Sequence, residues 1–318
     1  MPVVHLNELP PWLPLGIAIP LGLIFGSFIN VVIYRLPRDM SVVHPASHCP
    51  ACGKPIAPWD NVPVLSYLLL GGHARCCNAK MSLRYPVVEA LGGLVSWAIV
   101  VFIVRTLPGE TSVVRAAAIF TANFALCMGL LAAAFIDLEQ MILPDEITLG
   151  GTALGVLTAS LRGLGFVESI AAAAGAFFFI WFVFNYLYRK LRGITGMGMG
   201  DAKLLALAGA WFGISGLLFV LFAGSIQGSV GSILFRALGG KLGVPESVKA
   251  EIAELKEAAA KGDEEAIELL KNDPLAEERE GMMQAAIPFG PFLILAIYEF
   301  LFFKEHIAPI LRALLGVS

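Results

Sequence analysis

Two aspartates stand where they could share acid–base chemistry. Asp137 ends one apolar run, and Asp201 follows a glycine-rich segment and opens another. Because acidic residues at membrane depth are costly, two of them at the ends of apolar runs favour a shared polar site. Close carboxyl groups do not both ionise readily, so one would keep its proton while the other deprotonates a water molecule that attacks a peptide carbonyl. The pair is our candidate for peptide-bond hydrolysis, although either residue alone could equally cap a helix.

Residues around these aspartates could support such a site. Gly198 and Gly200 have no side chains and would let an extended substrate backbone lie close to Asp201. Lys203 could favour ionisation of a nearby carboxylate, or it could anchor its helix at the membrane interface, and the sequence leaves both roles open. Asp145 follows a proline and precedes an apolar run, so we expect it to be a helix N-cap.

Four cysteines are spaced like metal ligands: Cys49, Cys52, Cys76 and Cys77. The first two form a C-x-x-C motif and the others follow about 25 residues later, a spacing compatible with a tetrahedral zinc site. Adjacent thiolates from one chain would strain such a site, so His48 or His73 could replace one of them. The alternative is that the thiols are reduced, bind no metal and hold the loop by packing.

The composition predicts an all-α, polytopic membrane protein. Of 318 residues, 57% are apolar and only 15% are charged, whereas soluble domains carry roughly 25% charged residues. A helix needs about 20 residues to cross the hydrocarbon core. Charge-free runs near that length occupy residues 9–34, 116–136 and 169–188, and shorter ones occupy 90–104, 147–161 and 285–298. The run 204–235 is interrupted at Gly213 and predicts two passes, giving about eight transmembrane helices with both termini on one side.

The basic residues predict the orientation in the membrane. The segments 35–86, 189–203 and 236–286 hold 17 of the 22 lysines and arginines, so this side is expected to be cytoplasmic. Both aspartates and the cysteine loop belong to it. No basic residue precedes the first apolar run, so we expect a permanent anchor instead of a cleaved signal peptide. The net charge of −3 and the scattered basic residues indicate no nucleic-acid partner.

Six ordered segments resemble those of the type IV prepilin peptidases, membrane aspartyl proteases of the GxGD type. They read GSFINVVIYRLP at 26–37, CPAC at 49–52, SLRYPVVE at 82–89, DLEQMILPDEIT at 137–148, GMGD at 198–201 and PFGPFL at 288–293. The resemblance implies that the first aspartate of D-x-x-x-x-x-x-P-D and the aspartate of G-x-G-D are the catalytic pair. In this chain those residues are Asp137 and Asp201.

The resemblance also implies what such an enzyme acts on. Its substrates would be prepilins and pseudopilins of type IV pili and type II secretion, cleaved after a leader glycine at the bacterial inner membrane. The new N-terminus would then be methylated with S-adenosylmethionine, at a site placed only loosely in the first cytoplasmic loop and its flanking spans. The family usually has a second C-x-x-C; aligning Cys77 with its last cysteine puts Ala74 in the third ligand position, so Cys76 would have to replace it.

The expected domains follow from these segments. Residues 1–36 form the first transmembrane helix, and residues 37–86 form a cytoplasmic, zinc-ribbon-like cysteine loop. Residues 87–238 with 282–305 form the membrane-embedded peptidase core, and residues 239–281 form a charged cytoplasmic insert of one or two helices.

Other functions are compatible with parts of this pattern. A transporter could use Asp137 and Asp201 to relay protons, although such sites are expected near the bilayer midplane. A protease-like docking platform for secretion machinery would not need two intact aspartates. A peptidase without methyl transfer is a third alternative because of the altered cysteine set. The oligomeric state is not indicated by the sequence.

Overall fold

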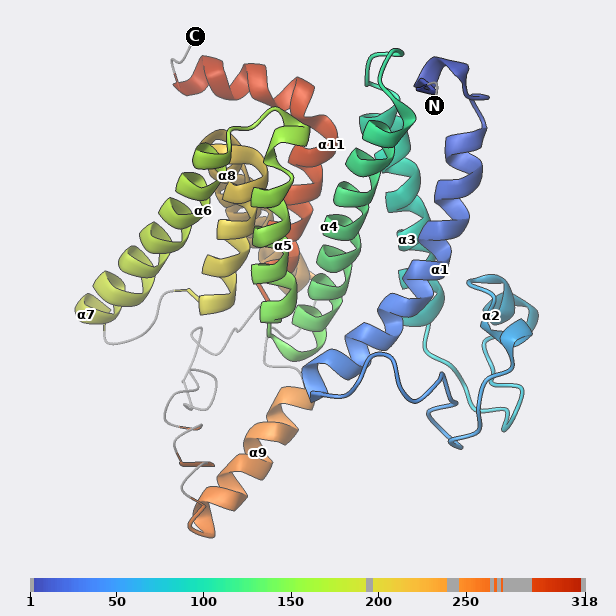
Figure 1. Cartoon of the computed structure of the whole chain (residues 1–318). Helices are drawn as coiled ribbons and strands as arrows, with labels where there is room; N and C mark the ends of the chain where they lie inside the picture. The colour runs from blue at the N-terminus through green and yellow to red at the C-terminus, as the bar shows by residue number, and fades with distance from the viewer. Residues whose placement is uncertain are drawn as a thin grey trace. The chain divides into compact units, whose positions relative to one another are not determined.

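The computed structural model describes residues 3–192, 197–238, 246–263, 266–267, 270 and 288–315. Within these ranges the regular elements are helices, with a few isolated β-bridges, which confirms the all-α prediction. The main helices, followed in Figure 1, are α1 (Leu13–Arg35), α3 (Arg84–Ile99), α4 (Val113–Gln140), α5 (Asp145–Leu157), α6 (Phe166–Ile180), α8 (Met199–Ala237), α9 (Glu246–Ala260) and α11 (Gly290–Leu315). The shorter elements are η1 (Leu6–Glu8), η2 (Leu36–Arg38), η3 (Pro58–Asn61), α2 (Leu65–Leu69), η4 (Val100–Val104), η5 (Ala159–Arg162), η6 (Trp181–Leu187) and α7 (Tyr188–Arg192).

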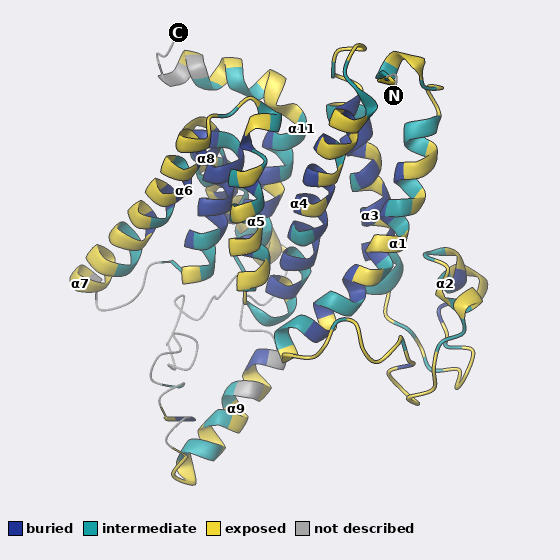
Figure 2. Ribbon diagram, in the orientation of Figure 1, coloured by how far each residue is buried: buried dark blue, intermediate teal, exposed yellow. Residues whose placement is uncertain are grey.

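In the part of the chain that the structure describes, five helical segments are long and apolar enough to cross a membrane: Leu13–Arg38, Arg84–Val104, Val113–Gln140, Phe166–Leu191 and Met199–Ala237. The protein is therefore a multi-pass membrane protein, while the total of eight spans stays a prediction. The predicted span 147–161 corresponds to α5, whose 13 residues extend only about 20 Å at 1.5 Å per residue. Figure 2 shows many exposed residues along α6, as expected of a helix that faces lipid.

The chain divides into two compact units, residues 1–133 with 301–305 and residues 134–300 with 306–318. In the first unit, α1 packs against α3 through small residues. A Cβ on Gly22 would lie 2.4 Å from the carbonyl oxygen of Gly92, and the Ser96 hydroxyl donates to Ala18 O at 2.6 Å. Small residues let two helix backbones approach closely in lipid, where apolar side chains alone do not drive association.

In the second unit, α8 is broken where the sequence predicted an interruption. Gly213 has φ 67° and ψ −165°, a backbone conformation open essentially to glycine alone. Before this break α8 packs against α5 and α6, where Trp211 Nε1 donates to Gly151 O at 2.8 Å. After the break α8 meets α11, and a Cβ on Gly224 would lie 2.7 Å from Leu293 Cδ2.

The predicted helical insert is represented by α9. Its bounds, Glu246–Ala260, confirm one of the one or two helices expected in residues 239–281. Residues 239–245, 264–265, 268–269 and 271–281 of that predicted segment lie outside the described residues.

Candidate active site

Asp137 lies in the last turn of α4, and only 5% of its surface is exposed. The backbone dipole disfavours a negative charge at that end of a helix, so Asp137 is not explained as a cap of its own helix. Its carboxylate instead accepts a hydrogen bond from the backbone N–H of Gly290, the first residue of α11. The N-terminus of α11 thus places the positive end of a helix dipole beside Asp137, where the C-terminal end of α4 is negative.

Asp201 lies in the first turn of α8, where the helix dipole favours a carboxylate. Its side chain accepts a hydrogen bond from the backbone N–H of Gly198, the N-cap residue of α8. This contact is half of a capping box, so the helix-capping alternative describes part of the role of Asp201. Asp201 also lies close enough to Asp137 for the two carboxyl groups to interact electrostatically.

The two predicted aspartates therefore come together at the N-termini of two helices. Among the residues that the structure describes, neither carboxylate forms an ion pair with a basic side chain. A buried carboxylate without a counter-ion is costly and is more often retained for function than for stability. The arrangement can hold a shared proton and activate a water molecule.

Glycines bring the protein backbone into contact with this site. A Cβ on Gly290 would lie 2.6 Å from Asp137 Oδ2 and 3.2 Å from Leu143 Cδ2. A Cβ on Gly200 would lie 3.0 Å from Leu143 Cβ. Gly200 is thus needed for internal packing against Leu143, and its predicted contact with a substrate stays a prediction. Gly290 was not singled out from the sequence, although it stands between two phenylalanines in PFGPFL.

Lys203 forms its ion pair with Asp145 and not with Asp137 or Asp201. Its Nζ lies 2.5 Å and 2.8 Å from the carboxylate oxygens of Asp145, so a role in ionising Asp201 is not supported by a direct contact. The predicted N-cap role of Asp145 is wrong, because Pro144 is the N-cap and Asp145 is the first residue of α5. The ion pair therefore links the starts of α5 and α8.

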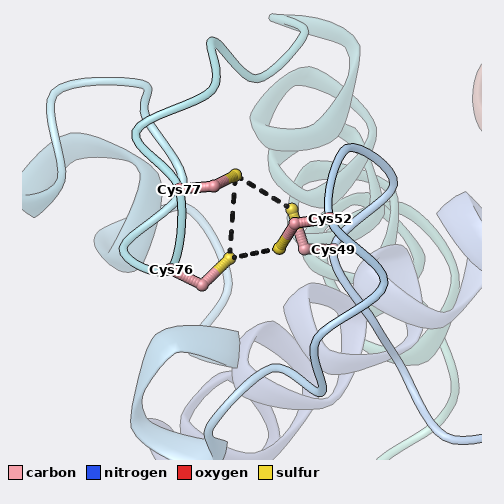
Figure 3. Close-up of side chains that lie close together, drawn as sticks. All are labelled: Cys49, Cys52, Cys76 and Cys77. Atoms are coloured by element: carbon pink, nitrogen blue, oxygen red, sulfur yellow. Dashed lines mark hydrogen bonds between the residues drawn. The ribbon is translucent and has the colours of Figure 1, made fainter.

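The four cysteines converge in the first unit (Figure 3), with all their sulfur atoms within 4.8 Å of one another. The Sγ–Sγ distances are 3.7 Å for Cys49 and Cys77, 3.2 Å for Cys52 and Cys76, and 3.9 Å for Cys76 and Cys77. Zn–S bonds of about 2.3 Å in a tetrahedron require sulfur atoms about 3.8 Å apart. The donor set fits one zinc ion, and its adjacent cysteines reach the cluster without help from His48 or His73.

The loop contains two matching turns, which explain the departure at position 74. The N–H of Cys49 donates to the carbonyl five residues later at 2.8 Å, and its own carbonyl accepts from the N–H four residues later at 2.9 Å. Ala74 makes the same two bonds, at 2.9 Å and 2.8 Å. Ala74 therefore occupies the place in the second turn that Cys49 has in the first, and Cys76 supplies the missing thiol from two residues further on.

The thiols differ in acidity within this cluster. Hydrogen bonds from the backbone N–H groups of Ala51 and Cys52 lower the pKa of Cys49 to about 7. The hydrogen bond to Cys52 raises the pKa of the Cys76 thiol to about 12. The first turn thus stabilises a thiolate, which is the form that binds metal.

Three buried polar residues tie the cysteine loop to its flanking helices. Glu89 on α3 accepts a hydrogen bond of 2.7 Å from the N–H of Val64, a β-branched residue with φ 60°. Asn30 Nδ2 on α1 donates to Tyr85 O at the start of α3 at 3.1 Å. Arg35 donates to two loop carbonyls at 3.0 Å and 2.8 Å. Residue spacing did not point to the contact between Glu89 and Val64.

Comparisons with known proteins identify the family. A model of the bacterial peptidase A24 N-terminal domain matches residues 21–103, and a model of the type IV leader peptidase family matches residues 124–233. The prepilin leader peptidase/N-methyltransferase of Neisseria gonorrhoeae is 36% identical over 256 residues, covering 71% of this chain and 83% of the relative. This chain belongs to the type IV leader peptidase family.

Other relatives carry the same name. The proteins of Burkholderia pseudomallei strain K96243 and Pseudomonas aeruginosa strain PAO1 are 37% and 35% identical, covering 72% and 71% of this chain and 78% and 82% of their own lengths. No solved structure matches the chain. The resemblance drawn from six motifs is confirmed, and the transporter alternative is not favoured. The leader peptidase match includes Asp137 and Asp201, whereas Gly290 lies beyond it.

Proposed function

We propose that the protein is a membrane aspartyl endopeptidase that removes the leader peptides of type IV prepilins and pseudopilins after a glycine. The names of its relatives support this substrate class. The observation that carries the residue assignment is the buried carboxylate of Asp137, held by the Gly290 N–H beside Asp201.

In this mechanism Asp137 and Asp201 act as a pair that shares one proton. The ionised carboxylate takes a proton from water, whose oxygen forms a bond to the scissile carbonyl carbon. The other carboxyl group donates a hydrogen bond to the carbonyl oxygen. The C–N bond then breaks as the leaving amine receives a proton. Gly198 and Gly200 would flank the extended substrate backbone, while Lys203 holds the helix start through Asp145.

The test is leader release from a pilin-like precursor by detergent-solubilised protein, followed by mass spectrometry. Asp137→Asn and Asp201→Asn keep side-chain shape and remove the acidity, so each variant should stay folded and lose cleavage. Normal cleavage by either variant would show that the assigned pair is wrong. An inactive wild-type protein on several precursors would contradict the function itself.

The same chain is proposed to methylate the new N-terminus, since its relatives are also named N-methyltransferases. The free amine would attack the methyl carbon of S-adenosylmethionine, so that an N–C bond forms, the S–C bond breaks and the amine loses a proton. Mature pilin should gain the mass of one methyl group only when S-adenosylmethionine is added. Cleaved pilin of unchanged mass would instead support the peptidase without methyl transfer.

The cysteine cluster is proposed to hold one structural zinc ion. Cys49, Cys52, Cys76 and Cys77 would fill all four positions, leaving none for a reacting water, so the ion would stabilise the loop without taking part in chemistry. Elemental analysis should find one zinc per chain and none in a Cys49→Ser/Cys52→Ser variant. Wild-type protein without metal would show that the thiols are free.

The predicted domains and orientation complete the proposal. The site would face the cytoplasm at the bacterial inner membrane, because the basic residues concentrate in the loops on that side. Residues 37–86 would be the zinc-binding loop, residues 87–238 with 282–305 the peptidase core, and residues 239–281 a cytoplasmic insert. Thiol labelling from each side of the membrane, at cysteines introduced into these loops, tests the orientation.

A further inference from the structure

A groove lies beside the active site, within the second unit. Its volume is about 350 Å³, and it is lined by Ser225, Gly228, Ser229 and Ser232 of α8 and by Phe289 and Phe292 at the start of α11. The aromatic rings press on the α8 backbone, because a Cβ on Gly228 would lie 3.3 Å from the ring of Phe289. The groove therefore has an aromatic floor and a wall of small residues.

The wall opens on an exposed, largely apolar face of α8. Ser225 and Ser229 are exposed, and their neighbours Phe222, Ile226 and Val230 are 64%, 64% and 49% exposed. The serine hydroxyls are not left as free donors in this apolar setting. Ser225 Oγ donates to the carbonyl four residues earlier at 2.6 Å, and Ser229 Oγ does the same at 2.8 Å. The groove therefore lies among exposed apolar side chains, and the hydroxyls of Ser225 and Ser229 already donate hydrogen bonds to backbone carbonyls of α8.

The groove adjoins the residue that holds the Asp137 carboxylate. Phe289 lines the groove, and the next residue, Gly290, donates its N–H to Asp137. Consecutive Cα atoms are about 3.8 Å apart, so a residue that lines the groove is one residue away in the chain from the glycine that contacts the carboxylate. The PFGPFL segment therefore presents its glycine to the active site and both of its phenylalanines to the groove.

We propose that this groove binds the apolar helix of the prepilin, over the residues that follow the scissile bond. This inference rests on the proposed function. The apolar helix of the prepilin lies in the lipid and can therefore reach an opening on the exposed apolar face of α8. The small residues of α8 that line the groove would allow the backbone of that helix to approach closely. Binding there places the start of that helix, and so the bond before it, beside Asp137. The phenylalanine floor supplies the apolar contact area.

Photo-crosslinking tests the occupant directly. A benzophenone amino acid is placed at Ser229 in the full chain carrying Asp137→Asn, in phosphatidylethanolamine and phosphatidylglycerol vesicles with a prepilin. The same probe at Ile226, exposed on the same helix but outside the groove, is the control. A crosslink to the prepilin helix from Ser229 and not from Ile226 supports the proposal. Crosslinks from Ser229 to lipid alone or to a second copy of the chain overturn it.

Kinetics supply an independent measurement. Ser229→Leu fills the groove, so KM for the full prepilin should rise about tenfold with kcat within a factor of two, as expected when ground-state and transition-state binding are lost together. KM for a short peptide that spans only the scissile bond should stay the same. Val230→Leu is the matched control and should behave as wild type. If the wild-type protein cleaves the prepilin and Ser229→Leu has an unchanged KM, the proposed role of the groove is wrong and the proposed function stands. If the wild-type protein does not cleave the prepilin, the proposed function itself is wrong.

Discussion

Gly290→Ala should disable the peptidase without unfolding it. A Cβ at this position would lie 2.6 Å from Asp137 Oδ2, about 0.8 Å short of the 3.4 Å at which ordinary contact begins. The carboxylate can relieve the clash by rotating, but it then loses the Gly290 N–H and its alignment with Asp201. A displacement of about 1 Å in a catalytic geometry costs on the order of 100-fold in rate. We therefore expect kcat to fall about 30-fold to 100-fold, equivalent to about 2–3 kcal/mol of transition-state stabilisation.

The assay for Gly290→Ala is leader release under saturating prepilin, with thermal unfolding measured on the same preparation. Gly150→Ala is the control, because a Cβ on Gly150 of α5 meets nothing within 4 Å. It should cleave at the wild-type rate. If Gly290→Ala is folded and its kcat lies within threefold of wild type, the contact between Gly290 and Asp137 does not position the carboxylate, and the reasoning is refuted.

Three further perturbations test other parts of the structure. Cys76→Ser should release the zinc, and adding Ala74→Cys should restore one zinc per chain by elemental analysis, since the two loop turns match; failure of this rescue would contradict the assigned register. Gly92→Leu should lower stability by about 3 kcal/mol or more in denaturant unfolding, because a Cβ there lies 2.4 Å from a backbone oxygen of α1; an unchanged midpoint would contradict the close crossing. Lys203→Met should change kcat less than tenfold, because it loses an ion pair with Asp145 worth less than about 1 kcal/mol; abolished cleavage would instead indicate a direct catalytic role.

Residue type and position alone made the catalytic candidates visible. Asp137 and Asp201 stand out because charge is rare in this chain and both occur at the ends of apolar runs. Their partners did not stand out, because a backbone N–H such as that of Gly290 belongs to every residue type except proline. Gly290 is 153 residues from Asp137 in the chain, so only tertiary packing brings the start of α11 to the end of α4.

In the cysteine loop, too, the sequence indicated the residues and the structure decided how they meet. Spacing predicted four metal ligands, but it also predicted strain between Cys76 and Cys77. The structure removes that obstacle, because the turn built on Ala74 directs both sulfur atoms into the cluster. Local backbone hydrogen bonds set that direction, and they have no signature in the identity of the cysteines.

The sequence by itself determined the helical class, the membrane setting, the family and the pair of aspartates, because hydropathy, charge and ordered motifs are properties of the chain read in one dimension. Tertiary structure alone decided which atoms touch those residues. The Gly290 N–H reaches Asp137, Lys203 pairs with Asp145, and Phe289 opens a groove beside the site. These contacts depend on how distant helices pack side by side at van der Waals distance, and sequence spacing does not encode that packing.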